Sequence, residues 1–281
     1  PLIWKFETSG NIYGRPAISD GVVYFGSYDN HLYALDAKTG KEKWKFEAGD
    51  SISSSPTISD GVVYFGSNDN HLYAVDSETG EEKWKFKTGD SISPSQTVLD
   101  GVVYFGSANN HLYAVDIKTG KEKWKFKTKY YGYSSPAISE GLVYFASANN
   151  HLYAVDSQTG EEKWKFSTGY PPFGFDEALS PAVVDGVVYF GSSDNHLYAV
   201  DIELAEKLSP SLKIKENELI KYGIKDENIR TQYISGKKTL EEVLELHNQH
   251  LKEKDENDKK REIKINLMNI NKSFMYIIKT I

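Results

Sequence analysis

The sequence predicts an all-β fold made of five repeated units, followed by a mostly α-helical segment. Three observations support this prediction. The stretch Gly21-Val-Val-Tyr-Phe-Gly-Ser, or a close variant, recurs at Gly61, Gly101, Gly141 and Gly186, with spacings of 40, 40, 40 and 45 residues. Each copy continues into Asn-His-Leu-Tyr-Ala-Val/Leu-Asp, and the first four then reach Thr-Gly and Lys-Trp-Lys-Phe. Aromatic residues make up 13% of the chain, which favours strands over helices.

Each unit is expected to contain four strands. In the second unit these are Ser54–Ser59, Val62–Ser67, His71–Asp76 and Glu82–Lys87. Asp60-Gly61 is the dipeptide of a tight hairpin turn, and Gly80 supplies the permissive backbone of a later turn. The Lys-Trp-Lys-Phe alternation puts Trp84 and Phe86 on one face of the fourth strand.

Four strands in about 40 residues are typical of a β-propeller blade, which must stack on its neighbours to bury its faces. The last unit, Pro181–Asp201, has three strands and no Trp, whereas Pro1–Thr8 is a fourth strand with no unit before it. We therefore predict a five-bladed propeller over residues 1–203. In this prediction the N-terminal strand closes the ring by pairing with the third strand of the last blade.

The stretch Ala74-Val-Asp-Ser-Glu-Thr-Gly-Glu-Glu-Lys-Trp84 resembles the tryptophan-docking motif of PQQ-type propellers. Ala34–Trp44, Ala114–Trp124 and Ala154–Trp164 match equally well. In that family the Trp packs against the neighbouring blade, and one Trp per unit at fixed spacing also indicates a packing device. A structural role is thus expected for Trp4, Trp44, Trp84, Trp124 and Trp164.

The family resembled has catalytic and non-catalytic members. Its quinoprotein dehydrogenases carry PQQ and calcium in an eight-bladed ring, and its non-catalytic members include BamB-like outer-membrane assembly lipoproteins and sensor domains of kinases. This chain has five repeats, no Cys for the vicinal disulfide of many of those enzymes, and no match to their calcium ligands. The resemblance therefore implies a non-catalytic, BamB-like propeller without a cofactor, and it favours a periplasmic or extracytoplasmic location.

Charge and composition narrow the function further. Residues 1–201 hold 17 Lys+Arg against 26 Asp+Glu, and residues 202–281 hold 16 against 14. An acidic propeller argues against binding to nucleic acid or to an anionic membrane surface. Without cysteine there is no disulfide and no thiolate chemistry, and no apolar run is long enough to span a bilayer. No signal peptide is visible, and the chain starts within the repeat pattern, as expected if a leader or an upstream domain had been removed.

Differences between the units gather in the connections that lead from the fourth strand of one unit to the first strand of the next. These connections emerge on one face of a propeller, so their variable residues should share one rim. Aromatic side chains with a few charges are typical of a ligand or peptide site. The alternative is that these loops simply drift, being weakly constrained. The candidate binding residues are Tyr13, Arg15, Gln96, Tyr131, Tyr133, Phe173, Phe175, Asp176 and Glu177.

Two other recurring positions favour structural roles. The histidines, His31, His71, His111, His151 and His196, are equivalent by repetition and should lie too far apart around a ring to share one ion. The aspartates that end the third strands are expected to cap turns. Asp176-Glu177 is a paired carboxylate suited to acid–base work, but exposed neighbouring acids are usually solvated. We therefore expect no metal site and no catalytic residue.

Residues 204–281 read as a separate, mostly helical segment. Thr239-Leu-Glu-Glu is a capping-box sequence that opens a helix to about Lys254. Lys252–Glu262 is either exposed helix or disordered, and Ile263–Ile281 is either a strand or a second helix. The segment packs on the propeller, binds a partner or is partly disordered.

Taken together, the sequence predicts a monomeric, non-catalytic binding or scaffold propeller, natural or engineered, for a protein, a peptide or a small ligand. The alternative is a PQQ-dependent oxidoreductase.

Overall fold

The fold is taken from a computed structural model, which describes residues 1–129, 134–148, 151–168, 180–192 and 195–206. The chain divides into two units, Pro1–Ser209 and Pro210–Ile281. The second unit lies outside the described residues, as do all the helices expected beyond residue 206. The expected domain boundary at residue 203 stays a prediction.

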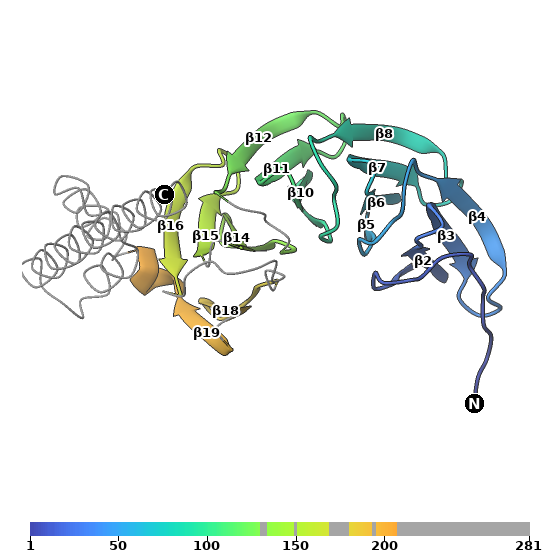
Figure 1. The fold of residues 1–281 in the computed structure, drawn as a ribbon, viewed down its shortest axis with the longest axis horizontal. Helices are drawn as coiled ribbons and strands as arrows, with labels where there is room; N and C mark the ends of the chain where they lie inside the picture. The colour runs from blue at the N-terminus through green and yellow to red at the C-terminus, as the bar shows by residue number, and fades with distance from the viewer. Residues whose placement is uncertain (130–133, 149–150, 169–179, 193–194, 207–281) are drawn as a thin grey trace, which may run out of the picture. The chain divides into compact units, whose positions relative to one another are not determined.

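The described part of the chain is a succession of antiparallel sheets (Figure 1). Four sheets have four strands in chain order, β1 to β4, β5 to β8, β9 to β12 and β13 to β16, and the last has three, β17 to β19. The strands are β1 (Ala17–Ser19), β2 (Val22–Gly26), β3 (His31–Asp36), β4 (Glu42–Glu47), β5 (Thr57–Ser59), β6 (Val62–Gly66), β7 (His71–Asp76), β8 (Glu82–Lys87), β9 (Thr97–Leu99), β10 (Val102–Ser107), β11 (His111–Asp116), β12 (Glu122–Lys127), β13 (Ala137–Ser139), β14 (Leu142–Ser147), β15 (His151–Asp156), β16 (Glu162–Ser167), β17 (Ala182–Val184), β18 (Val187–Ser192) and β19 (His196–Asp201).

The turns of each sheet follow from their residue types. Asp60 and Gly61 both have positive φ, 49° and 72°, as the tight turn between β5 and β6 requires. After β7, Asp76 Oδ1 accepts hydrogen bonds from the backbone N–H of Glu78 at 2.9 Å and of Thr79 at 3.1 Å. The turn closes with Gly80 at φ +75°. These bonds agree with the turn-capping role expected for the aspartates, and β7 and β8 have the predicted bounds.

Neighbouring sheets pack through apolar faces. Between the first two sheets, Tyr24, Leu32 and Ala34 contact a cluster from the second sheet that includes Val63 and Phe65, and all five are at most 2% exposed. The first strands of successive sheets also lie beside one another, from β1 and β5 through to β13 and β17. Each sheet thus buries its faces only by stacking, as predicted for blades.

The tryptophans bridge one sheet to the next. Trp44 Nε1 donates to the Ser77 carbonyl at 3.1 Å, and its ring covers Gly80, where a Cβ would come within 2.7 Å. The same bond joins Trp4 to Ala37, Trp84 to Ile117 and Trp124 to Ser157, at 3.0, 2.9 and 3.0 Å. This is the geometry of a packing device, and it needs glycine beneath the ring.

The predicted closure of the ring is corrected by the structure. The last sheet has three strands, and residues 1–8 belong to none of the sheets. Instead Trp4 and Phe6 pack against Phe25 and Tyr33 of the first sheet. The repeat pattern shows that the last sheet lacks its fourth strand. Whether residues 1–8 can reach that position depends on the rotation between successive sheets, which side-chain packing sets.

The end of the last sheet also departs from the repeat. Residues 202–206 are helical, where the other units have a Thr-Gly turn. Asp201 Oδ1 caps this helix by accepting from Leu204 N at 2.8 Å. As a result, two buried donors of the fourth sheet, Tyr144 hydroxyl and Trp164 Nε1, have no hydrogen-bond partner among the described residues. No helix in the described part of the chain is long and apolar enough to cross a membrane.

Candidate functional site

One end of the sheets carries both the variable connections and the turns between second and third strands. Ser51, in the connection from β4 to β5, accepts at its carbonyl from Asn68 N of the following sheet, at 3.0 Å. Its neighbour Ile52 donates from its N–H to the Ser27 carbonyl of the preceding sheet, at 3.1 Å. Connection 48–56 is thus held between two turns, and connection 88–96 is held in the same way. We call this surface, formed by connections 9–16, 48–56 and 88–96 and turns 27–30, 67–70 and 107–110, the connection face.

The first sheet presents an aromatic pair on the connection face. Tyr13 and Tyr28 are 64% and 43% exposed, and their ring centroids are 4.8 Å apart. Asn11 Nδ2 donates to the Tyr13 hydroxyl at 3.1 Å and fixes that ring. The equivalent positions hold Ser53 and Asn68 in the second sheet, so the pair is specific to the first unit among the described sheets.

Arg15 begins a belt of hydrogen bonds that crosses the sheets. Its N–H donates to Ser55 Oγ at 2.8 Å, and the same bond joins Ser55 to Ser95, Ser95 to Ser135 and Ser135 to Ser180. The backbone of Arg15 is therefore held in place while its side chain is exposed. Among the described residues its guanidinium makes no ion pair.

Gln96 belongs to connection 88–96, but its side chain is buried, whereas the sequence predicted it on the exposed rim. Its side chain is 4% exposed, with Nε2 donating to the Pro94 carbonyl at 2.8 Å. It takes the place of a proline in the other units, such as Pro56, and so it points into the sheet packing rather than to the rim. The other predicted residues, Tyr131, Tyr133, Phe173, Phe175, Asp176 and Glu177, lie outside the described residues.

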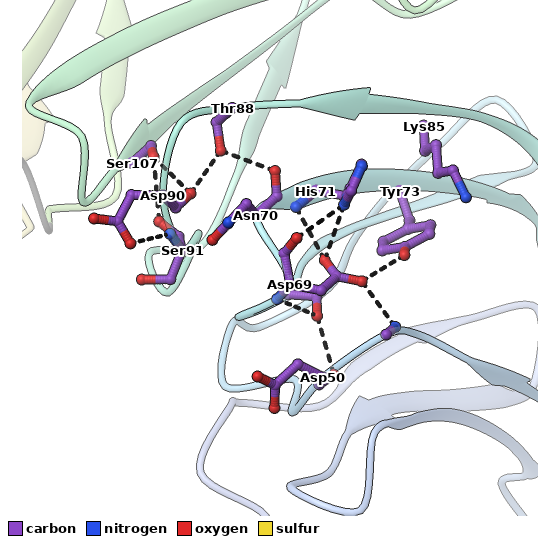
Figure 2. A network of polar contacts seen from close by, with 12 residues as sticks. Asp50, Asp69, Asn70, His71, Tyr73, Lys85, Thr88, Asp90, Ser91 and Ser107 are labelled. Atoms are coloured by element: carbon purple, nitrogen blue, oxygen red, sulfur yellow. Dashed lines mark hydrogen bonds and ion pairs between the residues drawn. The ribbon is translucent and has the colours of Figure 1, made fainter.

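A carboxylate network that the sequence analysis missed lies in the turns (Figure 2). Asp69 Oδ2 accepts from the Tyr73 hydroxyl at 2.6 Å and from Gly49 N at 2.8 Å, which ties the connection to the turn. His71 Nδ1 contacts the Asp69 carbonyl oxygen at 3.0 Å, and Lys85 Nζ lies 5.7 Å from the Tyr73 ring. Burial alone would raise the pKa of Asp69, but these hydrogen bonds outweigh it and lower that pKa.

The network recurs and explains the repeated histidines. In the first sheet Asp29 accepts from Tyr33 at 2.9 Å and Ser9 N at 3.0 Å, and burial with the Asp29 bond raises the pKa of Tyr33 to about 12. In the third sheet Asn109 donates to Tyr113 instead. The signal in the sequence is the recurrent Asp/Asn-Asn-His. These groups bond the turn of one sheet to the connection that leads into it. In the described ranges, no three His, Asp or Glu residues are grouped so that they could hold a metal ion.

Further hydrogen bonds hold connection 88–96. Thr88 Oγ1 donates to the carbonyls of Asn70 and Asp90, at 2.9 and 2.6 Å. Ser107 Oγ donates to the carbonyls of Asp90 and Ser91, at 3.0 and 3.2 Å (Figure 2). Connection 88–96 is therefore fixed by hydrogen bonds. Connection 9–16, which carries Tyr13, is bonded to the turn of its own sheet, because Tyr28 N donates to the Asn11 carbonyl at 2.9 Å.

Comparison with solved structures agrees with this architecture. BamB from Moraxella catarrhalis is similar with a TM-score of 0.60 and 22% identity, over 72% of this chain and 65% of that one. A quinohemoprotein alcohol dehydrogenase from Pseudomonas putida HK5 gives 0.60 and 22%, over 72% and 42%. A europium-containing methanol dehydrogenase gives 0.63 and 17%, over 73% and 52%. The chain thus spans less than two thirds of the length of these structures, and the likeness concerns the fold. No curated protein matches the sequence.

The stacked four-stranded sheets and their repeats define a β-propeller of the PQQ-like type. A family model, described as the β-propeller of the beta-alanine-activating enzyme, matches residues 1–227. The chain belongs to this family of β-propellers.

Proposed function

We propose that the chain is a non-catalytic binding or scaffold propeller that engages a protein or peptide segment on its connection face. The observation that carries the proposal is the exposed Tyr13–Tyr28 pair. Large exposed aromatic rings supply contact area at little conformational cost, which is typical of binding anchors, and the Tyr13 ring is held by the hydrogen bond from Asn11. BamB, one of the similar structures, resembles the kind of propeller proposed.

The charges around the pair indicate the chemistry of the partner. The connections of the face carry exposed Asp50 and Asp90, and the partly buried carboxylates of Asp29 and Asp69, which are bonded within the fold, add negative charge beneath them. Arg15 adds a positively charged guanidinium to the same face. A segment that offers an apolar or aromatic side chain to the tyrosines and a basic group to the acids fits this surface best.

The test uses a phage-displayed library of random peptides selected on the full chain. The variant Tyr13→Ser/Tyr28→Asn puts the residues of the second unit into the first, so the backbone should accept them. Selected peptides are expected to lose at least about tenfold in affinity for it, as for loss of a binding anchor.

The matched control is Leu99→Ser, because Leu99 is a 42% exposed apolar residue at the opposite end of the third sheet, where the second sheet carries Ser59. This control should bind the peptides normally. Equal binding by the double variant and the unmodified chain would refute the proposal, as would selection of peptides whose affinity falls only with Leu99→Ser.

The alternative function, a PQQ-dependent oxidoreductase, makes demands that the described residues do not meet. PQQ is a tricarboxylate, whereas the described connection face presents more carboxylates than cations, and the described ranges contain no cluster suited to calcium. Titration of the purified chain with PQQ and calcium, followed by absorbance, tests the alternative, because saturable binding would favour it.

A further inference from the structure

The two ends of the row of sheets expose apolar positions whose counterparts are buried or partly buried at interfaces between the described sheets. At the first sheet, Ile12 and Ile18 are 47% and 69% exposed. Their counterparts in the second sheet, Ile52 and Ile58, are fully and partly buried against the preceding sheet. The first sheet therefore exposes the surface that the second sheet buries against its preceding sheet.

Residues 1–8 supply some of the contacts that a preceding sheet would make. The Phe6 ring lies 5.3 Å from Tyr33, as Phe46 lies 5.3 Å from Tyr73. Trp4 covers Gly40, just as Trp44 covers Gly80. Trp4 and Phe6 thus take the place of a fourth strand from a preceding sheet, although no such sheet stands behind them among the described residues.

The last sheet has the opposite surface uncovered. Leu197 is 77% exposed and Tyr189 is 38% exposed, whereas their counterparts in the fourth sheet, Leu152 and Tyr144, are fully buried. Ala199 is likewise exposed. β19 has β18 as its single strand neighbour in the described sheet, whereas each other third strand lies between two strands.

The register of the four complete sheets shows that the two surfaces fit. Each third strand pairs its Leu with a Phe and its Ala with a Trp of the fourth strand, as Leu32 pairs with Phe46 and Ala34 with Trp44. Applied to β19, this register pairs Leu197 with Phe6 and Ala199 with Trp4.

Two further contacts would follow from the same superposition. Ile12 would meet Gly191 as Ile52 meets Gly26, where a Cβ would come within 2.2 Å of Ile52 Cγ2. The Tyr189 hydroxyl would donate to the Ala37 carbonyl, as the Tyr24 hydroxyl donates to that of Ser77 at 3.0 Å. The serine belt alone would be interrupted, because Arg15 replaces the serine that would accept.

We propose that the last sheet of one molecule binds residues 1–8 and the first sheet of a second copy of this chain, head to tail, with residues 1–8 added to β19 as its fourth strand. Within one molecule the Trp4 segment lies on its own first sheet while the last sheet stays three-stranded, so both surfaces are exposed in the part of the chain that the structure describes. A second copy offers each surface the partner that four interfaces of the same chain already display. Such a contact is heterologous and builds rings or filaments according to its rotation.

Cysteine pairing in the full chain tests the register, since the chain has no cysteine of its own. By the pairing of His31 with Glu47, His196 should face Glu7 of the second copy, within reach of a disulfide. Mixing a Glu7→Cys chain with a His196→Cys chain under mild oxidation should give the mixed dimer. The control partner is His151→Cys, whose position already pairs with Ser167 inside the fourth sheet.

Each outcome decides the proposal. A mixed dimer with His196→Cys well above the His151→Cys control supports it. A disulfide that forms within a monomer of the double Glu7→Cys/His196→Cys chain, with none between the single variants, would show closure of one molecule and overturn it. Absence of both disulfides would overturn it too.

Sedimentation velocity of the full chain over a range of concentrations provides an independent measurement. The unmodified chain should associate with rising concentration. Leu197→Lys should weaken that association at least about tenfold, as expected for a charge placed at an interface core. Because Leu197 is exposed within the monomer, the circular dichroism spectrum of the Leu197→Lys chain should match that of the unmodified chain. Leu99→Lys is the control and should associate normally; a monomer at all concentrations would contradict the proposal.

Discussion

Trp124→Phe is expected to destabilise the propeller more than Trp164→Phe does. The two tryptophans are 7% and 2% exposed, and their rings meet Tyr104 and Tyr144 at 5.8 and 5.7 Å with the same interplanar angle of 48°. They differ at Nε1. Trp124 donates to the Ser157 carbonyl at 3.0 Å, whereas Trp164 Nε1 has no acceptor among the described residues because helix 202–206 replaces the accepting turn.

The magnitude follows from that one difference. The change from indole to phenyl removes a similar volume at both sites, so the packing loss largely cancels in the comparison. At Trp124 the variant gives up a hydrogen bond with a net contribution of about 1 kcal/mol. At Trp164 it removes a buried unsatisfied donor, whose desolvation costs about 1–3 kcal/mol. Trp164→Phe should therefore leave the chain about 2–4 kcal/mol more stable than Trp124→Phe.

Urea unfolding followed by far-ultraviolet circular dichroism measures the difference, because that signal does not depend on the tryptophan removed. The free energies are comparable if the slope with urea is unchanged. Trp44→Phe serves as the second control, since Trp44 bonds Ser77 as Trp124 bonds Ser157. Equal losses at Trp124 and Trp164, or a larger loss at Trp164, would refute the reasoning.

Two further predictions concern the turns. Gly120→Ala should cost more stability than Gly101→Ala, by about 1–3 kcal/mol of overpacking, because both residues have positive φ but only at Gly120 would the new Cβ lie within 2.8 Å of the Trp84 ring; equal thermal unfolding midpoints would contradict this. The hydrogen bond from Lys83, with those of the turn, lowers the pKa of Asp76 to about 2, so its stabilisation is present above about pH 4 and is lost as pH falls towards 2. Asp76→Asn should accordingly reduce the dependence of the urea midpoint on pH between 4 and 2, and an unchanged dependence would count against it.

The candidate site was predictable where it depends on comparison of the repeats. Tyr13 and Arg15 differ from their counterparts and are exposed on the connection face. Tyr28 was not predicted, although it differs from its counterpart Asn68 in the same way, because it lies in a turn and not in a connection. Gln96 was misplaced because a polar residue in a variable segment resembles a surface residue, whereas its neighbours bury it.

The sequence by itself determined the repeat, the bounds of strands such as β7 and β8, and the turns with their capping aspartates. These features depend on local hydrogen bonds and on side-chain alternation, which the order of residues sets. Only the tertiary structure decided whether residues 1–8 pair with the last sheet. Residues 1–8 carry every feature of a fourth strand, yet they lie on the first sheet and not beside β19, because the distance between the ends depends on small rotations that accumulate over four packed interfaces.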